Sequence, residues 1–137
     1  MRKVILILFV LSAGFGMSQD IIKPDVALYN IGEKVIVIGT VDQIKHSDKA
    51  VFLNMGGNYP DNPFAAVIFN SDKDNFKNVD SYEGREVEIS GIVKRYKGKQ
   101  EIILNSSAQI KILRLSRVKY HKYTPLLRNL GKEDKED

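Results

Sequence analysis

The sequence has 137 residues, which is enough for one domain around one hydrophobic core. It contains no cysteine, and this excludes disulfides, thiolate nucleophiles and thiolate metal sites. The formal net charge is +4, but the charge is distributed unevenly along the chain.

Charge divides the chain into an acidic part and a basic part. Residues 20–84 carry six Lys and ten Asp or Glu, a net of −4, whereas residues 85–128 carry eleven Lys or Arg and three Glu, a net of +8. The last six residues, 132–137, sum to −2. A basic part of this kind can attract an anionic partner, and a solvated basic surface without a ligand is the alternative.

The N-terminal segment has the pattern of a secretory signal. Two basic residues precede an apolar run that is short for a membrane span, and Gly16 and Ser18 are small residues suited to a cut after Ser18. We therefore expect residues 1–18 to be a signal peptide and the mature chain to be exported, to the periplasm or outside, without membrane insertion. An uncleaved membrane anchor is the alternative. Residues 19–25 are predicted to be a short lead-in.

Apolar, β-branched runs separated by turn residues predict five strands and one helix. Cap-type residues Ser71 and Asp72, followed by Phe76 and Val79, predict a helix of two turns. In chain order, the predicted elements are strands at 34–44, 51–55 and 64–69, the helix at 71–80, a strand at 85–96, and an interrupted strand at 100–104 and 109–113.

The first and fourth predicted strands share one pattern. Residues 35–41 and 87–93 both read Val-x-(Val/Ile)-x-Gly-x-Val, which places Gly39 and Gly91 in the phase of the core-facing positions. Strands with such a glycine can coil sharply, as a small closed barrel requires. The number of strands also favours a barrel over a sandwich, which would need about seven.

Several phrases of the sequence are similar to those of bacterial exported OB-fold modules, which also occur attached to secreted nuclease-like proteins. They are Phe52-Leu-Asn-Met-Gly-Gly-Asn-Tyr-Pro60, Phe64 with Ile68-Phe69, Phe76, Tyr82-Glu-Gly-Arg-Glu-Val87, and Gly91-Ile-Val-Lys-Arg-Tyr-Lys-Gly98 with Ile102. The resemblance covers residues 26–114. It implies an all-β domain, a five-stranded OB-fold Greek-key barrel with a helix between strands 3 and 4, and oligonucleotide binding as the default function.

An OB-fold binds single strands across strands 2 and 3 and the flanking loops, with aromatic side chains for bases and cations for phosphates. Residues at the corresponding places are candidates for such contacts, whereas strand periodicity favours core positions for Phe52, Phe69 and Phe76. The candidate nucleic-acid-binding residues are Asn54, Tyr59 and Phe64 on the central hairpin, and Lys94, Arg95, Tyr96, Lys97 and Lys99 near the last turn.

Other chemistries find little support in the sequence. His46 and His121 are far apart and lack patterned carboxylates, so we expect no metal site and no cofactor. No nucleophile motif or phosphate-binding glycine loop is present, so we expect no enzymatic activity. The sequence thus favours an exported protein that binds single-stranded nucleic acid with little sequence specificity. The alternative is an envelope module that binds oligosaccharide or protein.

The C-terminal tail, residues 115–137, interleaves basic and aromatic residues before its acidic end. It is predicted either to pack over one end of the barrel or to form a basic arm that binds nucleic acid or an anionic surface.

Overall fold

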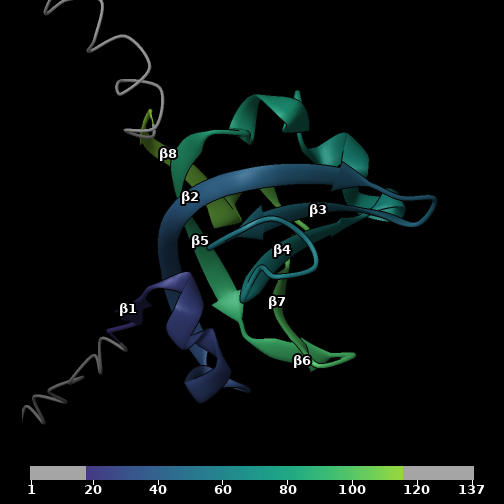
Figure 1. Cartoon of the computed structure of the whole chain (residues 1–137). Coiled ribbons are helices and arrows are strands. Elements are labelled where there is room, and N and C mark those ends of the chain that lie inside the picture. The colour runs from purple at the N-terminus through teal and green to yellow at the C-terminus, as the bar shows by residue number, and fades with distance from the viewer. Residues whose placement is uncertain (1–17, 116–137) are drawn as a thin grey trace, which may run out of the picture.

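A computed structural model describes residues 18–115, which fold into eight strands with short 3₁₀ helices between them (Figure 1). The predicted signal peptide, apart from Ser18, and the predicted tail beyond residue 115 lie outside the described residues. The elements are β1 (Asp20–Ile22), η1 (Pro24–Asn30), β2 (Lys34–His46), β3 (Ala50–Met55), β4 (Phe64–Phe69), η2 (Asn70–Asn75), η3 (Val79–Tyr82), β5 (Arg85–Ile92), β6 (Lys94–Tyr96), β7 (Lys99–Ile103), η4 (Ser107–Gln109) and β8 (Ile110–Leu115).

The strands form one mixed sheet in the order β6-β7-β4-β3-β2-β5-β8, with β1 added to β2. Neighbours are antiparallel except for two parallel pairs, β4 with β7 and β1 with β2. The two ends of this path are linked by the chain, because β6 follows β5 after Val93 and η4 joins β7 to β8. A curled sheet with this connectivity is consistent with the predicted OB-like fold.

The strand count differs from the prediction for local reasons. The predicted strand 85–96 is interrupted at Val93, whose backbone N–H donates to the Glu33 carbonyl at 3.0 Å and whose carbonyl accepts from the Gly32 N–H at 2.8 Å. Bonding to this loop takes Val93 out of the strand ladder. β1, in the predicted lead-in, is a further addition. The predicted interruption of the last strand is present, but its two halves are separate strands, because β7 pairs with β4 and β8 pairs with β5.

Strand β2 is long enough to pair with three neighbours, and it bends between them. Its register against β3 shifts between Val41 and Gln43. A Cβ atom at Gly39 would meet the Pro24 side chain of η1 at 2.8 Å, and a Cβ atom at Gly91 would meet an Ile102 methyl at 2.5 Å. Both glycines therefore permit close packing that any larger residue would prevent.

The predicted two-turn helix is wrong in type. The segment after β4 forms two separate 3₁₀ helices, η2 and η3, and the residue before η2 is Phe69 rather than Ser71 or Asp72. Asn78 lies between them in a left-handed conformation, with φ of 47°, which an α-helix cannot accommodate. The apolar residues predicted for this helix, Phe76 and Val79, are nevertheless buried in the core.

The core lies inside the curled sheet. It is built from alternate residues of the strands, including Val37, Leu53, Phe64 and Ile89, all fully buried. Because side chains alternate along a strand, the other set of positions faces outward. Within residues 18–115 no helix is long and apolar enough to cross a membrane.

Candidate binding groove

Two adjoining hollows of about 470 and 330 Å³ lie on the outer face of the sheet and together form what we call the groove. Both hollows include Ser47, Phe52, Tyr96 and Glu101, so they lie side by side. The other lining residues are Lys45, Asp48, Lys49, Ala50, Asn54, Tyr59, Pro60, Asn62, Ala65, Val67, Phe69, Lys97 and Lys99.

The floor of the groove follows from strand register. Phe52 of β3 lies opposite Val67 of β4, and Ala65 of β4 lies opposite Glu101 of β7. Directly opposed residues share a face, so these side chains form one outward row while their neighbours fill the core. The small side chain of Ala65 leaves open the space above it, and Phe52 bounds that space with its ring.

The β3–β4 loop forms one wall of the groove and is held by buried amides. The Asn62 side chain donates to the Asn54 Oδ1 and to the Phe64 carbonyl, each at 3.1 Å. The Asn54 side chain donates to Gln43 Oε1 at 3.1 Å, and the same oxygen accepts from the Tyr59 backbone N–H at 2.9 Å. This network joins the loop to β2 and β3 and sets the position of Tyr59 over the groove.

Two tyrosines flank the groove, each with a lysine near its ring. The Lys45 ammonium lies 3.6 Å from the centre of the Tyr59 ring, and the Lys97 ammonium lies 5.4 Å from that of Tyr96. Tyr59 is 55% exposed and Tyr96 is 58% exposed, so both rings retain an accessible surface. A cation over an aromatic ring is attracted to its face, and this favours lysines at the rim of the groove.

Lys99 lies beside these residues, but its ammonium is already engaged. It donates to the backbone carbonyl of Pro60, to that of Asn62 at 2.9 Å, and to the Asn62 side-chain oxygen at 3.5 Å. An ammonium has three donors, so these contacts account for all of them. Lys99 therefore secures the β3–β4 loop from below, although the sequence suggests a phosphate contact.

The structure places the other residues that were predicted to bind nucleic acid in different environments. Phe64 is fully buried in the core, so its predicted surface position is wrong; it lies on the face of β4 that packs against the interior. Lys94 lies opposite Glu101 on the groove face, whereas Arg95 lies opposite Gln100 on the alternate face. Neither Lys94 nor Arg95 lines the two hollows. Asn54 does line the groove, but it is 2% exposed and serves the loop network.

Sequence reasoning misses two aromatic residues of the groove. Strand periodicity favours core positions for Phe52 and Phe69, yet Phe52 is half-buried on the groove floor and Phe69 is 40% exposed at one end. No sequence pattern singles out Lys45 or Lys49 either. A signal is available for Phe52, because Val51, Leu53 and Met55 already supply an apolar face of β3 with the opposite phase.

Two acidic residues line the groove, Asp48 in the β2–β3 turn and Glu101 on the floor among the aromatic residues. Glu101 is 9% exposed, it lines both hollows, and it lies opposite Ala65 and Lys94. Burial raises the pKa of its carboxyl, and the positive charge of Lys94 offsets part of that rise. Among the described residues no Lys, Arg or His nitrogen lies within ion-pair distance of this carboxyl.

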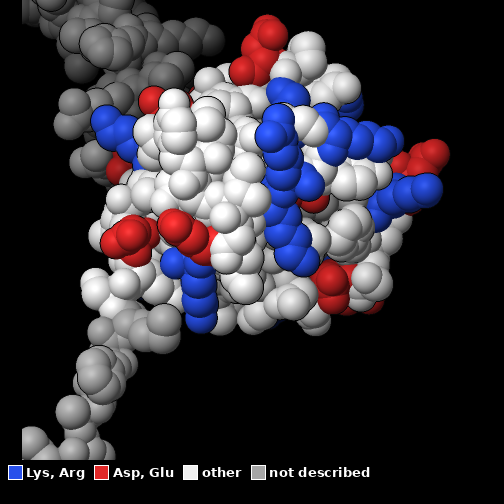
Figure 2. All heavy atoms as spheres, turned by 90° about the horizontal axis from the view of Figure 1, so that it is seen from below, with Lys and Arg blue, Asp and Glu red and all other residues white. Residues whose placement is uncertain are grey.

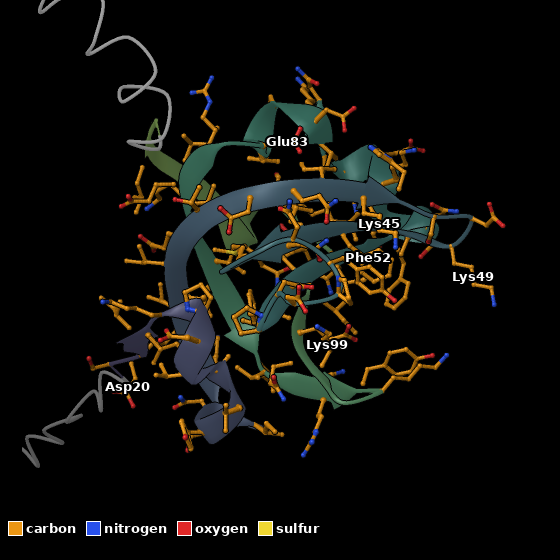
Figure 3. All side chains as sticks on the ribbon, in the orientation of Figure 1. Asp20, Lys45, Lys49, Phe52, Glu83 and Lys99 are labelled. Atoms are coloured by element: carbon orange, nitrogen blue, oxygen red, sulfur yellow. The ribbon has the colours of Figure 1, made fainter. Side chains whose placement is uncertain are left out.

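Figure 3 shows how the labelled groove residues lie. Lys45, Phe52 and Lys99 come from different strands and gather on one side of the sheet, while Lys49 extends from the β2–β3 turn; Asp20 and Glu83 lie elsewhere. In the view from below, Figure 2 shows many of the visible Lys and Arg side chains gathered in one band, with acidic side chains to either side. In the part of the chain that the structure describes, no three metal-ligating side chains cluster.

Comparison with known proteins concerns the fold. No protein-family model matches the sequence, and no curated protein matches it. The match to the asparaginyl-tRNA synthetase of Entamoeba histolytica covers 87% of this chain and 28% of the synthetase chain, with a TM-score of 0.50 and 18% sequence identity. The match to the asparaginyl-tRNA synthetase of Pyrococcus horikoshii covers 65% of this chain and 22% of the synthetase chain, with a TM-score of 0.44 and 20% identity. The match to an OBody bound to hen egg-white lysozyme covers 63% of this chain and 84% of the OBody chain, with a TM-score of 0.47 and 22% identity.

The asparaginyl- and aspartyl-tRNA synthetase matches span 21–28% of those chains, so this protein is similar to one part of each synthetase. At this level of identity, the E. histolytica match supports a shared fold and leaves the ligand to be argued from the groove.

Proposed function

We propose that this protein binds single-stranded nucleic acid in the groove with little sequence specificity. The observation that carries the proposal is the placement of exposed aromatic rings along one groove whose rim is basic. Bases would stack on Phe52 and on the tyrosines at the walls, and phosphates would lie near Lys45, Lys49 and Lys97. The similarity to a tRNA synthetase is compatible with such a ligand, because the name of that enzyme includes a nucleic acid, tRNA.

The groove has a size that fits a short stretch of a nucleic-acid strand. Stacking contributes about 1–3 kcal/mol per base, and each lysine at the rim adds a phosphate contact that salt weakens. Two or three stacked bases with a few such contacts correspond to a binder with a Kd on the order of micromolar at low salt.

An oligosaccharide or protein ligand at the cell envelope is the second candidate. The Glu101 carboxyl on the groove floor favours it, because a carboxylate accepts hydrogen bonds from hydroxyl or amide groups and repels phosphate. The lysines at the rim favour a polyanion over a neutral chain. The two candidates differ in salt dependence, which therefore decides between them.

The direct test is fluorescence anisotropy of a labelled ten-nucleotide single strand, measured over a range of salt concentrations. The wild-type protein should bind at low salt, and log Kd should rise with log salt. Lys97→Glu should lower that slope by about 0.7, the value for one phosphate contact on a single strand. Lys111→Glu, on β8 and outside the groove, should leave the slope near its wild-type value.

Aromatic stacking is tested with the same assay. Phe52→Ala should weaken binding about 5- to 150-fold, which corresponds to the loss of one stacked base. Tyr29→Ala is the matched control, because Tyr29 is 77% exposed on η1 and does not line the groove. No binding at low salt, or equal affinities for Phe52→Ala and wild type, would overturn the proposal.

We further propose that the mature protein is exported. The basic and apolar pattern of residues 1–18 supports this. Expression in a bacterial host followed by N-terminal sequencing should give a chain that begins at Gln19 in the periplasmic or extracellular fraction. A full-length chain in the cytoplasm would refute it.

A further inference from the structure

Glu101 is unusual because it brings a negative charge to the floor of a groove with lysines at its rim. Its side chain is 9% exposed and forms part of both hollows, so its carboxyl reaches the ligand space. Its neighbours on the floor, Phe52 and Ala65, supply no hydrogen-bond donor in their side chains. The nearby ammonium of Lys99 is directed to the β3–β4 loop.

This arrangement constrains which part of a nucleic acid could lie on the floor. A phosphate there would meet the Glu101 carboxylate, and two negative charges in a partly desolvated place repel strongly. Phosphates are therefore directed to the rim, where Lys45 and Lys97 lie beside tyrosine rings. The bases are left to lie on the floor, with one base edge facing Glu101.

An ionised carboxylate accepts hydrogen bonds and donates none. Cytosine presents an amino donor at N4, whereas thymine presents the acceptor O4 at the same place. Lys94, opposite Glu101, stabilises the ionised form of the carboxyl but does not pair with it at short distance. The carboxyl oxygens are therefore available to a ligand donor.

We propose that Glu101 gives the groove a preference for bases that present an exocyclic amino donor, so that cytosine is bound more tightly than thymine. This inference rests on the proposed function and adds to it a residue that determines base preference. The preference is modest, because the aromatic floor accepts any base and only one edge contact distinguishes them.

The test compares labelled dC10 and dT10 by fluorescence anisotropy at pH 8 and low salt. Wild type should bind dC10 about tenfold more tightly than dT10. In Glu101→Gln the ratio should fall to within about twofold, because a glutamine amide offers both a donor and an acceptor. Glu88→Gln, which makes the same charge change on β5 outside the groove, should keep the wild-type ratio. Circular dichroism checks that both variants fold.

A second measurement uses only the wild-type protein. A ten-nucleotide strand of N4,N4-dimethylcytosine lacks the amino donors and should lose the preference over dT10. If dT10 binds as tightly as dC10, or if the dimethylated strand binds like dC10, the inference is overturned while the proposed function stands. If neither dC10 nor dT10 binds, the proposed function fails and this inference fails with it.

Discussion

Replacing Lys99 with Met separates the role that the structure assigns to this lysine from the role that its position in a basic turn suggests. Methionine keeps much of the apolar stem, so the change removes chiefly the ammonium. That ammonium donates to the backbone carbonyls of Pro60 and Asn62 and, at 3.5 Å, to the Asn62 side chain. We therefore expect a loss of folding stability, together with weaker binding through a less ordered loop.

The size of the stability loss follows from these contacts. A hydrogen bond from a charged donor contributes about 1.5–3 kcal/mol. The 3.5 Å contact is weak, and Pro60 is exposed so that water can replace the ammonium there. The expected loss is about 2 kcal/mol, and for a domain of this size it corresponds to a fall in Tm of roughly 8–16 °C.

Urea unfolding followed by circular dichroism measures this loss. Lys97→Met is the matched control, because the described contact of its ammonium is with the Tyr96 ring at 5.4 Å. It should cost less than about 0.5 kcal/mol. In the binding assay the order of the two variants should be reversed. Lys97→Met should lower the slope of log Kd against log salt, whereas Lys99→Met should leave that slope unchanged. Equal unfolding midpoints for Lys99→Met and wild type would refute the stabilising role assigned to the contacts between the Lys99 ammonium and the β3–β4 loop.

Two further predictions concern stability. Gly91→Ala should cost about 1–3 kcal/mol in urea unfolding, because the new methyl would lie 2.5 Å from an Ile102 methyl, in addition to the strain of a side chain at φ of 158°. Gly98→Ala, in open space with φ of 77°, should cost about 1 kcal/mol from backbone strain alone. A loss no larger at position 91 would contradict this packing. Since the folded-state pKa of Glu101 is raised above its unfolded value, its ionised form carries a penalty that disappears as pH falls through that raised pKa. Glu101→Gln should thus unfold at higher urea than wild type at pH 7, with the difference shrinking towards pH 4; a variant less stable than wild type at pH 7 would refute the assignment.

The strand positions are largely predictable from the sequence, but the buried face of a strand is predictable only where its pattern alternates. In β3, Val51, Leu53 and Met55 alternate with Phe52 and Asn54, which indicates the buried set, and the predicted core position of Phe52 does not agree with that alternation. In β4 the run Phe64–Phe69 is apolar throughout. An uninterrupted apolar run gives no phase, and this is why the sequence-based prediction puts Phe64 outside and Phe69 inside, the reverse of the structure.

The basic turn at residues 97–99 is a second place where the sequence predicts the position of an element but does not predict what its side chains contact. Lys97 and Lys99 are indistinguishable as sequence neighbours of Gly98, yet one ammonium lies beside a tyrosine ring and the other is bonded to a loop far away in the chain. The difference arises because β7 pairs in parallel with β4, which places Lys99 beneath the β3–β4 loop. No local pattern records that pairing.

From the sequence alone follow the positions of most strands, the turn residues and the two glycines within strands, because these depend on period-2 alternation and on local backbone preferences. Strand β1 and the break at Val93 do not follow from it. The fold then decides what the central hairpin presents. Pairing of β3, β4, β7 and β6 across the sheet turns Phe52 into a floor residue, buries Phe64, engages Lys99 and brings Glu101 among the aromatic residues. These outcomes depend on which strands cover which face, and that is settled by contacts between residues distant in the chain.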